Sequence, residues 1–233
     1  MDALEIAMRQ SARDSGCSPE DFLKSENTVV ISSPLPDAKI YLKKPQDFFL
    51  VKYGGCEVVA VNEKIYSPAV EYFAKNGHLD VADLSAFGLK PTYLTVHYLP
   101  AKDQTPLPCR YETRVLYQKD FSELYLPEWE NALCKKRKEL DMLAVGAYDK
   151  GKLVGLAGAS ADCEDMWQIG IDVLNEYRLQ GIASALTSRL ACEIKKHGKL
   201  PFYTTIFGNI PSMKNAHKSG FKPAWIQIQA DFI

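Results

Sequence analysis

The stretch that decides the fold runs from an apolar strand into an amphipathic helix: Ile171-Asp172-Val173-Leu174-Asn175-Glu176-Tyr177-Arg178-Leu179-Gln180-Gly181-Ile182-Ala183-Ser184-Ala185-Leu186. The apolar residues of 166–173 predict a strand, and the spacing of apolar residues over 181–196 predicts a helix with one buried face. A short polar connection joins them and places Arg178 just before Gly181, where the helix starts.

This connection has the chemistry of an anion site. The first turn of a helix has N–H groups without intrahelical partners and the positive end of the peptide dipoles, which together favour a bound phosphate. Gly181 lets the backbone approach an anion without an intervening Cβ, Ala183 is small, and Arg178 is placed to add charge-assisted hydrogen bonds. An ordinary strand-to-helix turn without a ligand has the same residues, so the connection alone leaves both interpretations open.

Arg178-x-x-Gly181-x-Ala183 resembles motif A of the GNAT superfamily, in which Arg/Gln-x-x-Gly-x-Gly/Ala holds the pyrophosphate of acetyl-CoA. Downstream, Asn209-Ile-Pro-Ser212 and Gly220-Phe221 fall at the spacing of the family's motif B. The resemblance covers roughly residue 110 to the C-terminus. It implies an α/β (α+β) fold with a mixed, mostly antiparallel central sheet flanked by helices, and an acyl-CoA-dependent N-acetyltransferase activity.

The resemblance also implies how acetyl-CoA, the co-substrate, is bound. In the family the fourth and fifth strands splay apart around the pantetheine arm, and these strands map here to 166–173 and 202–207. Backbone groups at Asp172, Val173 and Leu174 would meet the pantetheine and thioester, and the loop amides would meet the pyrophosphate. The residues expected to bind the cofactor are Val173, Leu174, Arg178, Leu179, Gln180, Gly181, Ile182, Ala183, Asn209 and Ser212.

Direct attack of an amine on the thioester requires a base for the amine proton, stabilisation of the oxyanion and an acid for the leaving thiolate. The expected bases are Asp172, Glu164 and Asp165, with Glu128 and Glu130 as further candidates, although each is more often a solvated carboxylate. Asp172 stands out because it interrupts an apolar strand, where a carboxylate is costly to bury without a partner. Strand alternation puts it on the same face as Gly170.

One position departs from the family pattern. Many members place a tyrosine acid seven residues after the motif B asparagine, and that position here is Ala216. A catalytically silent acyl-CoA-binding module or sensor is therefore the alternative to an active transferase.

The proline-containing stretch 100–108 predicts a boundary between an N-terminal α/β domain of unassigned role, residues 1–105, and an acetyltransferase domain, residues 106–233. The N-terminal half leaves room for a degenerate second GNAT-like unit or for a separate substrate-recognition domain. Two predicted elements matter below. Residues 39–42 are expected to form a strand, and residues 121–139 a helix with a break near Pro127.

Composition limits the partners. The 233 residues carry a formal net charge of -1, with 46% hydrophobic and 24% charged residues, so no basic excess exists to bind a nucleic-acid backbone. The N-terminus lacks the pattern of a signal peptide and no apolar run is long enough to span a bilayer, so we expect a cytoplasmic protein without membrane contact.

Six cysteines occur without a Cys-x-x-Cys spacing, so free thiols and no metal are expected. The expected partner is a small-molecule or peptide amine acceptor. The identity of that amine, the acyl-chain preference and the oligomeric state stay open.

Overall fold

The computed structural model describes residues 2–233 and divides into two compact units. Unit 1 contains the chain up to His97 together with Ile206–Gly208 and Ala224–Ile233, and unit 2 contains Tyr98–Thr205 and Asn209–Pro223. The division at residues 105 and 106 that the sequence predicts differs from this grouping mainly in the last strand. That strand, β10 (Phe221–Phe232), pairs antiparallel with β2 (Phe48–Tyr53), so the C-terminus belongs with unit 1.

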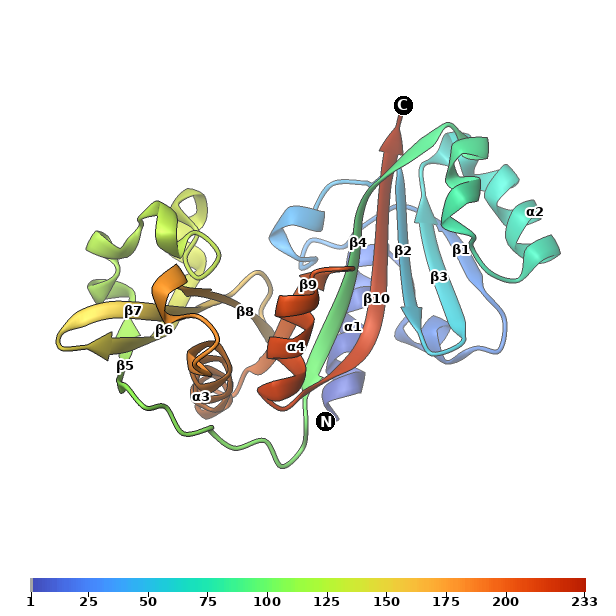
Figure 1. Ribbon diagram of the computed structural model, residues 1–233. Helices are drawn as coiled ribbons and strands as arrows, with labels where there is room; N and C mark the ends of the chain where they lie inside the picture. Colours follow the sequence, from blue (N-terminus) through green and yellow to red (C-terminus); the bar gives the residue numbers. More distant parts are fainter. Residues whose placement is uncertain (1) are drawn as a thin grey trace. The chain divides into compact units, whose positions relative to one another are not determined.

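The strands of unit 1 are ordered β1-β3-β2-β10-β4, with β1 (Thr28–Ile31), β3 (Cys56–Val61) and β4 (Leu89–Pro100) added to the two already named. β1 runs parallel to β3, while β2 and β3 form an antiparallel hairpin (Figure 1). Gly54 makes the hairpin turn at a φ of 59°, a left-handed conformation that glycine adopts without strain.

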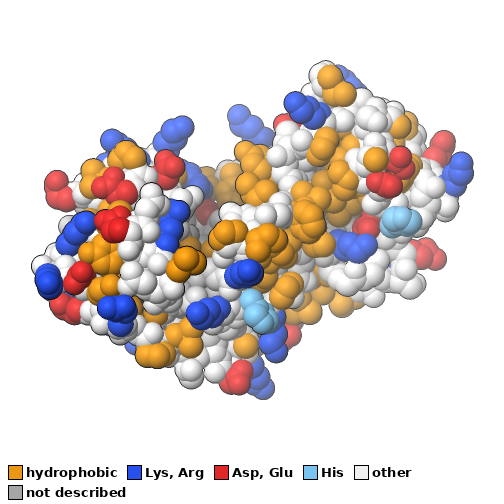
Figure 2. Space-filling model, in the orientation of Figure 1, with side chains coloured by type: hydrophobic (Ala, Val, Ile, Leu, Met, Phe, Trp, Pro, Cys, Tyr) orange, Lys and Arg blue, Asp and Glu red, His pale blue; other side chains and the backbone are white. Residues whose placement is uncertain are grey.

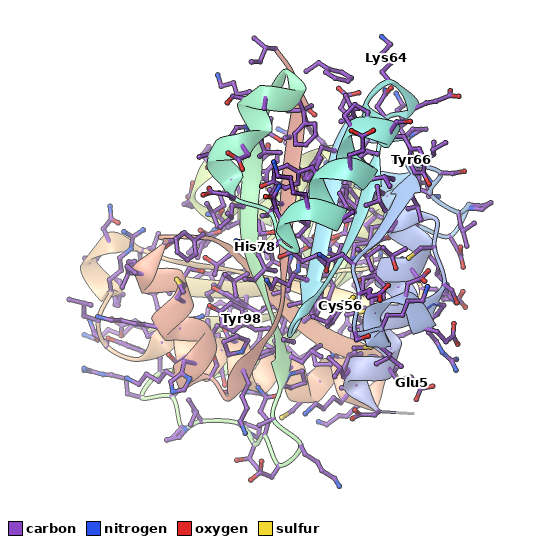
Figure 3. All side chains as sticks on the ribbon, turned by 90° about the vertical axis from the view of Figure 1, so that its right-hand side faces the viewer. Glu5, Cys56, Lys64, Tyr66, His78 and Tyr98 are labelled. Atoms are coloured by element: carbon purple, nitrogen blue, oxygen red, sulfur yellow. The ribbon has the colours of Figure 1, made fainter. Side chains whose placement is uncertain are left out.

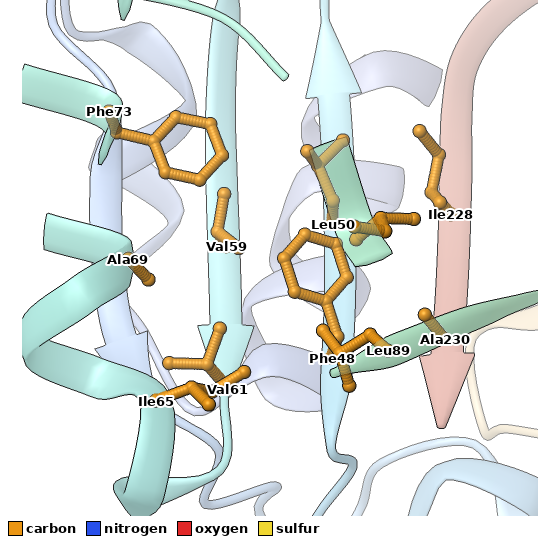
Figure 4. Packing of buried hydrophobic residues seen from close by; sticks show 11 residues of the cluster. Phe48, Leu50, Val59, Val61, Ile65, Ala69, Phe73, Leu89, Ile228 and Ala230 are labelled. Carbon is orange, nitrogen blue, oxygen red and sulfur yellow. The ribbon is translucent and has the colours of Figure 1, made fainter. Parts of the chain in front are cut away.

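Helices cover both faces of this sheet. α2 (Tyr66–Asn76) buries Ala69 and Phe73 against Val59 and Leu50 on one face (Figure 4). α1 (Ala3–Ser15) lies on the other face, where its Ser11 hydroxyl hydrogen-bonds the Tyr53 hydroxyl at 3.0 Å. Figure 3 labels Tyr66 and Cys56, the first residues of α2 and β3. Four 3-10 turns connect these elements: η1 (Pro19–Leu23), η2 (Ile40–Leu42), η3 (Glu63–Ile65) and η4 (Val81–Phe87).

The strand predicted over residues 39–42 is wrong, because the segment forms the turn η2. Lys39 is fully buried, and both its backbone N–H and its ammonium group bind the carboxylate of Asp14 on α1. A buried ammonium requires such a partner, because isolated burial of a charge costs several kcal/mol. The ion pair between Lys39 and Asp14 of α1 therefore fixes the backbone of this segment. The sequence of residues 39–42 alone does not predict that pair.

Unit 2 contains β5 (Glu112–Tyr117), β6 (Asp141–Asp149), β7 (Lys152–Ser160), β8 (Met166–Val173) and β9 (Leu200–Ile206), in the order β9-β8-β7-β6-β5. All neighbours in this order pair antiparallel except β8 and β9, which are parallel. α3 (Ile182–Lys196) packs against β6, β7 and β8, and α4 (Ile210–Lys218) contacts α3. The predicted mixed, mostly antiparallel sheet flanked by helices is confirmed.

The helix predicted over residues 121–139 is wrong. The segment forms 3-10 turns, namely η6 (Ser122–Leu124), η7 (Pro127–Trp129) and η8 (Lys135–Leu140), which follow η5 (Gln118–Asp120). Pro127 has no N–H to donate, and the N–H groups of Asn131 and Ala132 donate to Asp172 of β8. Burial of Phe121, Trp129 and Leu133 against the sheet stabilises this irregular path.

The succession β3, η3, α2, η4, β4 in the N-terminal half resembles the succession β8, η9 (Asn175–Tyr177), α3, β9, with η4 as an additional turn. This repeat agrees with the predicted degenerate second GNAT-like unit. However, β3 has β1 and β2 as neighbours, and α2 begins after Ile65 without a glycine. The described N-terminal half therefore has no counterpart of the Arg178–Gly181 loop of the C-terminal half.

The surface of unit 1 exposes apolar side chains beside β4. Tyr93, Ile206 and Phe207 are all more than half exposed, and the Phe207 N–H donates to the Leu94 carbonyl at 2.8 Å. On the face shown in Figure 2, Lys and Arg side chains are interspersed with Asp and Glu. Across residues 2–233, no helix has the length and apolar character needed to cross a bilayer.

The placement of β10 gives a first prediction. Truncation after Pro223 removes the partner of β2 and the buried side chains of Trp225 and Ile228, and each large apolar side chain contributes about 1.5–3 kcal/mol of burial. We expect the truncated protein to lose the cooperative thermal unfolding of unit 1, measured by circular dichroism. A truncated protein with the melting transition of the full chain would contradict this assignment of β10.

Candidate functional site

The parallel pairing of β8 with β9 ends part-way along both strands. The register runs from Met166 opposite Leu200 to Ile169 opposite Tyr203. β8 continues from Gly170 to Val173, where it remains paired with β7 on its other side. The two strands that the family resemblance predicts to splay apart therefore stop pairing after Ile169 and Tyr203.

The register of β8 with β7 shows which backbone groups face this opening. The Leu174 N–H donates to the Val154 carbonyl at 3.0 Å, so the neighbouring pair of Val173 with Gly155 is a non-hydrogen-bonded pair. By the same alternation, the N–H and C=O groups of Val173 and Ile171 point away from β7, whereas those of Asp172 point toward it. The backbone of Val173 thus faces the opening, and so does that of Ile171, which sequence reasoning missed. The backbone of Asp172 and the Leu174 N–H, which were expected to meet the pantetheine, point to β7 instead.

The loop that follows β8 carries an exposed helix start. Gly181 is the N-cap of α3 with a φ of 83°, and no side chain caps the helix. The first intrahelical bond that forms is Ala185 N–H to the Gly181 carbonyl at 3.1 Å, so the N–H groups of residues 182–184 have no intrahelical partner. No atom lies within 4 Å of the position that a Cβ on Gly181 would take. This open, uncapped start fits a pyrophosphate group.

Leu179 is part of the same loop and has a φ of 63°, which is unusual for a bulky residue. Its side chain is wholly exposed, so packing does not impose this conformation. The loop thus contains two left-handed residues, Leu179 and Gly181, directly before the helix. Sequence reasoning selected the position but had no signal for its conformation, because leucine disfavours positive φ.

Two side chains tie the loop to the sheet. Arg178 donates from Nε to the Val173 carbonyl at 3.1 Å, and its guanidinium carries four further N–H donors. Gln180 accepts a 2.7 Å hydrogen bond from the Tyr111 hydroxyl and donates to the Glu176 carbonyl at 3.4 Å. Arg178 therefore links the end of β8 to the loop and keeps a positive charge beside the start of α3.

The predicted motif B residues open α4. The Asn209 side chain caps this helix by accepting from the Ser212 N–H at 3.2 Å, and the Ser212 hydroxyl hydrogen-bonds the Tyr203 hydroxyl at 2.9 Å. Asn215 donates to the same Tyr203 hydroxyl at 3.4 Å. The side chains of Asn215, Ser184 and Thr187 form further hydrogen bonds between α3 and α4. Tyr203, which sequence reasoning missed, therefore lies where the ladder of β8 and β9 ends and is held from α4.

The three carboxylates proposed as bases lie at different ends of β8. Asp172 is beside the opening, where it accepts hydrogen bonds from Asn131 and Ala132. Glu164 and Asp165 are exposed and precede β8, at the end where β8 and β9 are still paired. At about 3.3 Å per residue, Asp165 is about 26 Å along the strand from Val173. Glu128 and Glu130 are exposed on the segment that contacts Asp172.

Residues 110–221 match the family model described as Acetyltransferase (GNAT) family, and this match contains the strand opening, the glycine loop and α4. The C-terminal half of this chain belongs to the GNAT family. The GNAT fold supports acyl transfer in general, and GNAT proteins generally bind acetyl-CoA. No curated protein matches the sequence.

Two solved structures with TM-scores of 0.50 or more share the fold at low sequence identity. A GCN5-related N-acetyltransferase-like protein from Streptococcus suis is 18% identical, with a TM-score of 0.52 over 99% of this chain and 100% of its own. A GNAT-family acetyltransferase from Colwellia psychrerythraea is 15% identical, with a TM-score of 0.50 over 82% of both chains. A GNAT acetyltransferase from Novosphingobium aromaticivorans is 14% identical, with a TM-score of 0.46 over 61% of this chain and 66% of its own. The likeness to the S. suis protein extends through the N-terminal half.

No group of three or more His, Cys, Asp or Glu side chains within residues 2–233 is arranged to hold a metal ion. The six cysteines are free thiols in the structure.

A buried carboxylate at the first residue of β6 gives the second prediction. Burial raises the pKa of Asp141 to about 6, against the opposing hydrogen bonds from the Cys134 N–H and the Tyr125 hydroxyl. The folded state then binds a proton more tightly than the unfolded state, so the stability linked to Asp141 is full below about pH 4 and is lost as the pH rises through 6. Asp141→Asn should therefore raise the melting temperature relative to wild type at pH 8 but not at pH 4. Equal differences at both pH values in calorimetry would contradict this.

Proposed function

We propose that this protein transfers an acetyl group from acetyl-CoA to the nitrogen of a small-molecule or peptide amine. The observation that carries the proposal is that β8 stops pairing with β9 immediately before a loop that ends in an uncapped helix start at Gly181. A backbone with polar groups facing an opening and a positive helix end beside it suit a ligand with an amide-containing arm and a pyrophosphate.

Each part of the site has a proposed role. The N–H groups of residues 182–184 and the Arg178 guanidinium would hold the pyrophosphate, with Leu179, Gln180 and Gly181 shaping the loop. Backbone groups of Val173 and Ile171 would hydrogen-bond the pantetheine arm, with Leu174 beside them. Asn209 and Ser212 would contact the cofactor from the start of α4. Acetyl-CoA supplies the acetyl group as an activated thioester.

The transfer forms one C–N bond and breaks one C–S bond. The amine nitrogen loses a proton to a base, and the thiolate sulfur that leaves gains one. Asp172 is the one of the three expected base residues that lies beside the opening of β8 and β9. Glu164 and Asp165 would have to act from the paired end of the strand, about 17 to 20 Å from Gly170 at the usual rise per residue.

A catalytically silent acyl-CoA-binding module is the second candidate, and two observations favour it. Ala216 is completely buried at the position where many family members carry a tyrosine acid. The Asp172 carboxylate already accepts three hydrogen bonds. Release of free thiol from acetyl-CoA in the presence of a panel of primary amines separates the two, because the silent module binds the cofactor without turnover.

The third prediction tests the cofactor loop with two matched variants. Asn and Asp both tolerate the left-handed conformation that Gly181 adopts, and they have nearly the same size. Gly181→Asp places a negative charge at the pyrophosphate position and should weaken acetyl-CoA binding at least tenfold, or about 1.4 kcal/mol. Gly181→Asn keeps the site neutral and should weaken binding much less.

Isothermal titration calorimetry of both variants and the wild type is the measurement. An equal loss in Asp and Asn variants would indicate a steric effect and not an anion. If Gly181→Asp binds acetyl-CoA with wild-type affinity and has an unchanged circular dichroism spectrum, the assignment of the pyrophosphate to this loop is wrong.

A further inference from the structure

The Asp172 carboxylate is held by one short segment of the chain. It accepts the Asn131 N–H at 2.9 Å, the Asn131 side-chain amide at 2.7 Å and the Ala132 N–H at 3.0 Å. A carboxylate has about four acceptor positions, so most of its hydrogen-bonding capacity is used. A base must offer a lone pair to the incoming proton, whereas here the lone pairs point at N–H donors.

Two glycines accommodate the other side of the same segment. Gly158 of β7 and Gly170 of β8 are direct cross-strand partners. A Cβ on Gly158 would overlap the Ala132 carbonyl, and a Cβ on Gly170 would overlap the Asn131 carbonyl. The backbone at residues 131 and 132 therefore lies directly on the sheet, with its carbonyl groups above the glycine pair and its N–H groups on Asp172.

Buried side chains on either side complete the attachment. Trp129 and Leu133 are each about 3% exposed and pack in the core that covers this face of the sheet. Asn131 between them is exposed. The segment is thus fixed at both ends by apolar burial and in the middle by hydrogen bonds, while its polar side faces solvent beside residues 170–172.

The segment lies on the face of the sheet opposite α3. A Cβ on Gly155 would meet the side chains of Ile182, Leu186 and Val173, so Val173 points to the α3 face. Asp172, the next residue along, points to the other face. With the pyrophosphate at the start of α3, an amine would approach the opening of β8 from the face that carries residues 129–133.

We propose that Asp172 is a positioning residue, which fixes the segment of residues 129–133 as the wall of the amine site, and that it does not take the amine proton. The inference rests on the proposed function. It assigns the recognition of the acceptor to an irregular segment that is anchored on a pair of glycines.

Two substitutions disturb the attachment of Asn131 and Ala132 to β8 by different physical means. Asp172→Asn removes the charge and replaces one acceptor oxygen with an N–H donor that faces other donors. Gly170→Ala adds a methyl group under the Asn131 carbonyl and changes no titratable group. Gly146→Ala is the matched control, because the added methyl would meet only side-chain atoms of Leu153 and Tyr148.

The assay is thiol release from acetyl-CoA with the most active primary amine of the panel, measured as a function of pH. We expect Asp172→Asn and Gly170→Ala both to raise the KM for the amine at least tenfold, with the affinity for acetyl-CoA within twofold of wild type. The shape of the pH profile should be unchanged in both, and Gly146→Ala should behave as wild type.

Three results would overturn the proposal. The first is loss of the acidic limb of the pH profile in Asp172→Asn alone, which identifies Asp172 as the base. The second is an unchanged KM for the amine in both variants. The third is an effect of Gly146→Ala as large as that of Gly170→Ala. If Gly170→Ala does not fold, Asn131→Ala, which removes one of the three hydrogen bonds, should show the same change in KM at smaller size.

Failure of the proposed function is seen separately. A wild type that does not bind acetyl-CoA, or binds it without turnover of any amine, counts against transferase activity. Amide hydrogen exchange then measures directly how firmly Asp172 holds the backbone of Asn131 and Ala132. Faster exchange of the Asn131 and Ala132 amides in both Asp172→Asn and Gly170→Ala supports the positioning role, and exchange at the wild-type rate contradicts it.

Discussion

β8 loses β9 as a hydrogen-bonding partner after Ile169, and the arrangement of unit 2 follows from that loss. Backbone N–H and C=O groups inside a sheet are costly to leave without partners. The Val173 carbonyl is met by Arg178, which draws the following loop to the end of the strand. The same contact places the cationic side chain beside the start of α3. One interruption of a parallel ladder therefore creates both an opening and a charged border for it.

The two faces of the sheet border this opening in different ways. On the α3 face the groups are those that stabilise an anion: uncapped amides, the helix dipole and Arg178. On the other face the charge is the Asp172 carboxylate, which holds the backbone of Asn131 and Ala132. Glycines at 158 and 170 allow that backbone to lie flat on the strands. Cofactor and acceptor would thus be separated by the sheet itself and would meet only where the strands part.

The core of unit 1 contains buried polar and aromatic groups that contact one another. Asp14 and Lys39 pair in a fully buried position, and the rings of Tyr53, Trp225 and His97 stack across neighbouring strands, with centroids 5.5 and 4.6 Å apart. Burial and the nearby Lys39 charge hold the pKa of His97 well below its usual range, so the ring is neutral at physiological pH. Each of these contacts joins segments that are distant in sequence. Together they stabilise the positions of β10 and β4 in the sheet of unit 1.

The sequence by itself determined the elements whose signals are local. Apolar periodicity defined β8 and α3, and Gly181 and Arg178 marked the loop between them. Only the tertiary structure decided what depends on contacts between distant residues. The segment of residues 129–133 is irregular because it bonds to Asp172, 41 residues from Asn131, and residues 39–42 turn because Lys39 reaches Asp14, 25 residues away. The role of Asp172 was likewise decided by the tertiary structure. A carboxylate in an apolar strand indicates from sequence that it needs hydrogen-bond partners, but only the folded chain shows that Asn131 and Ala132 are those partners.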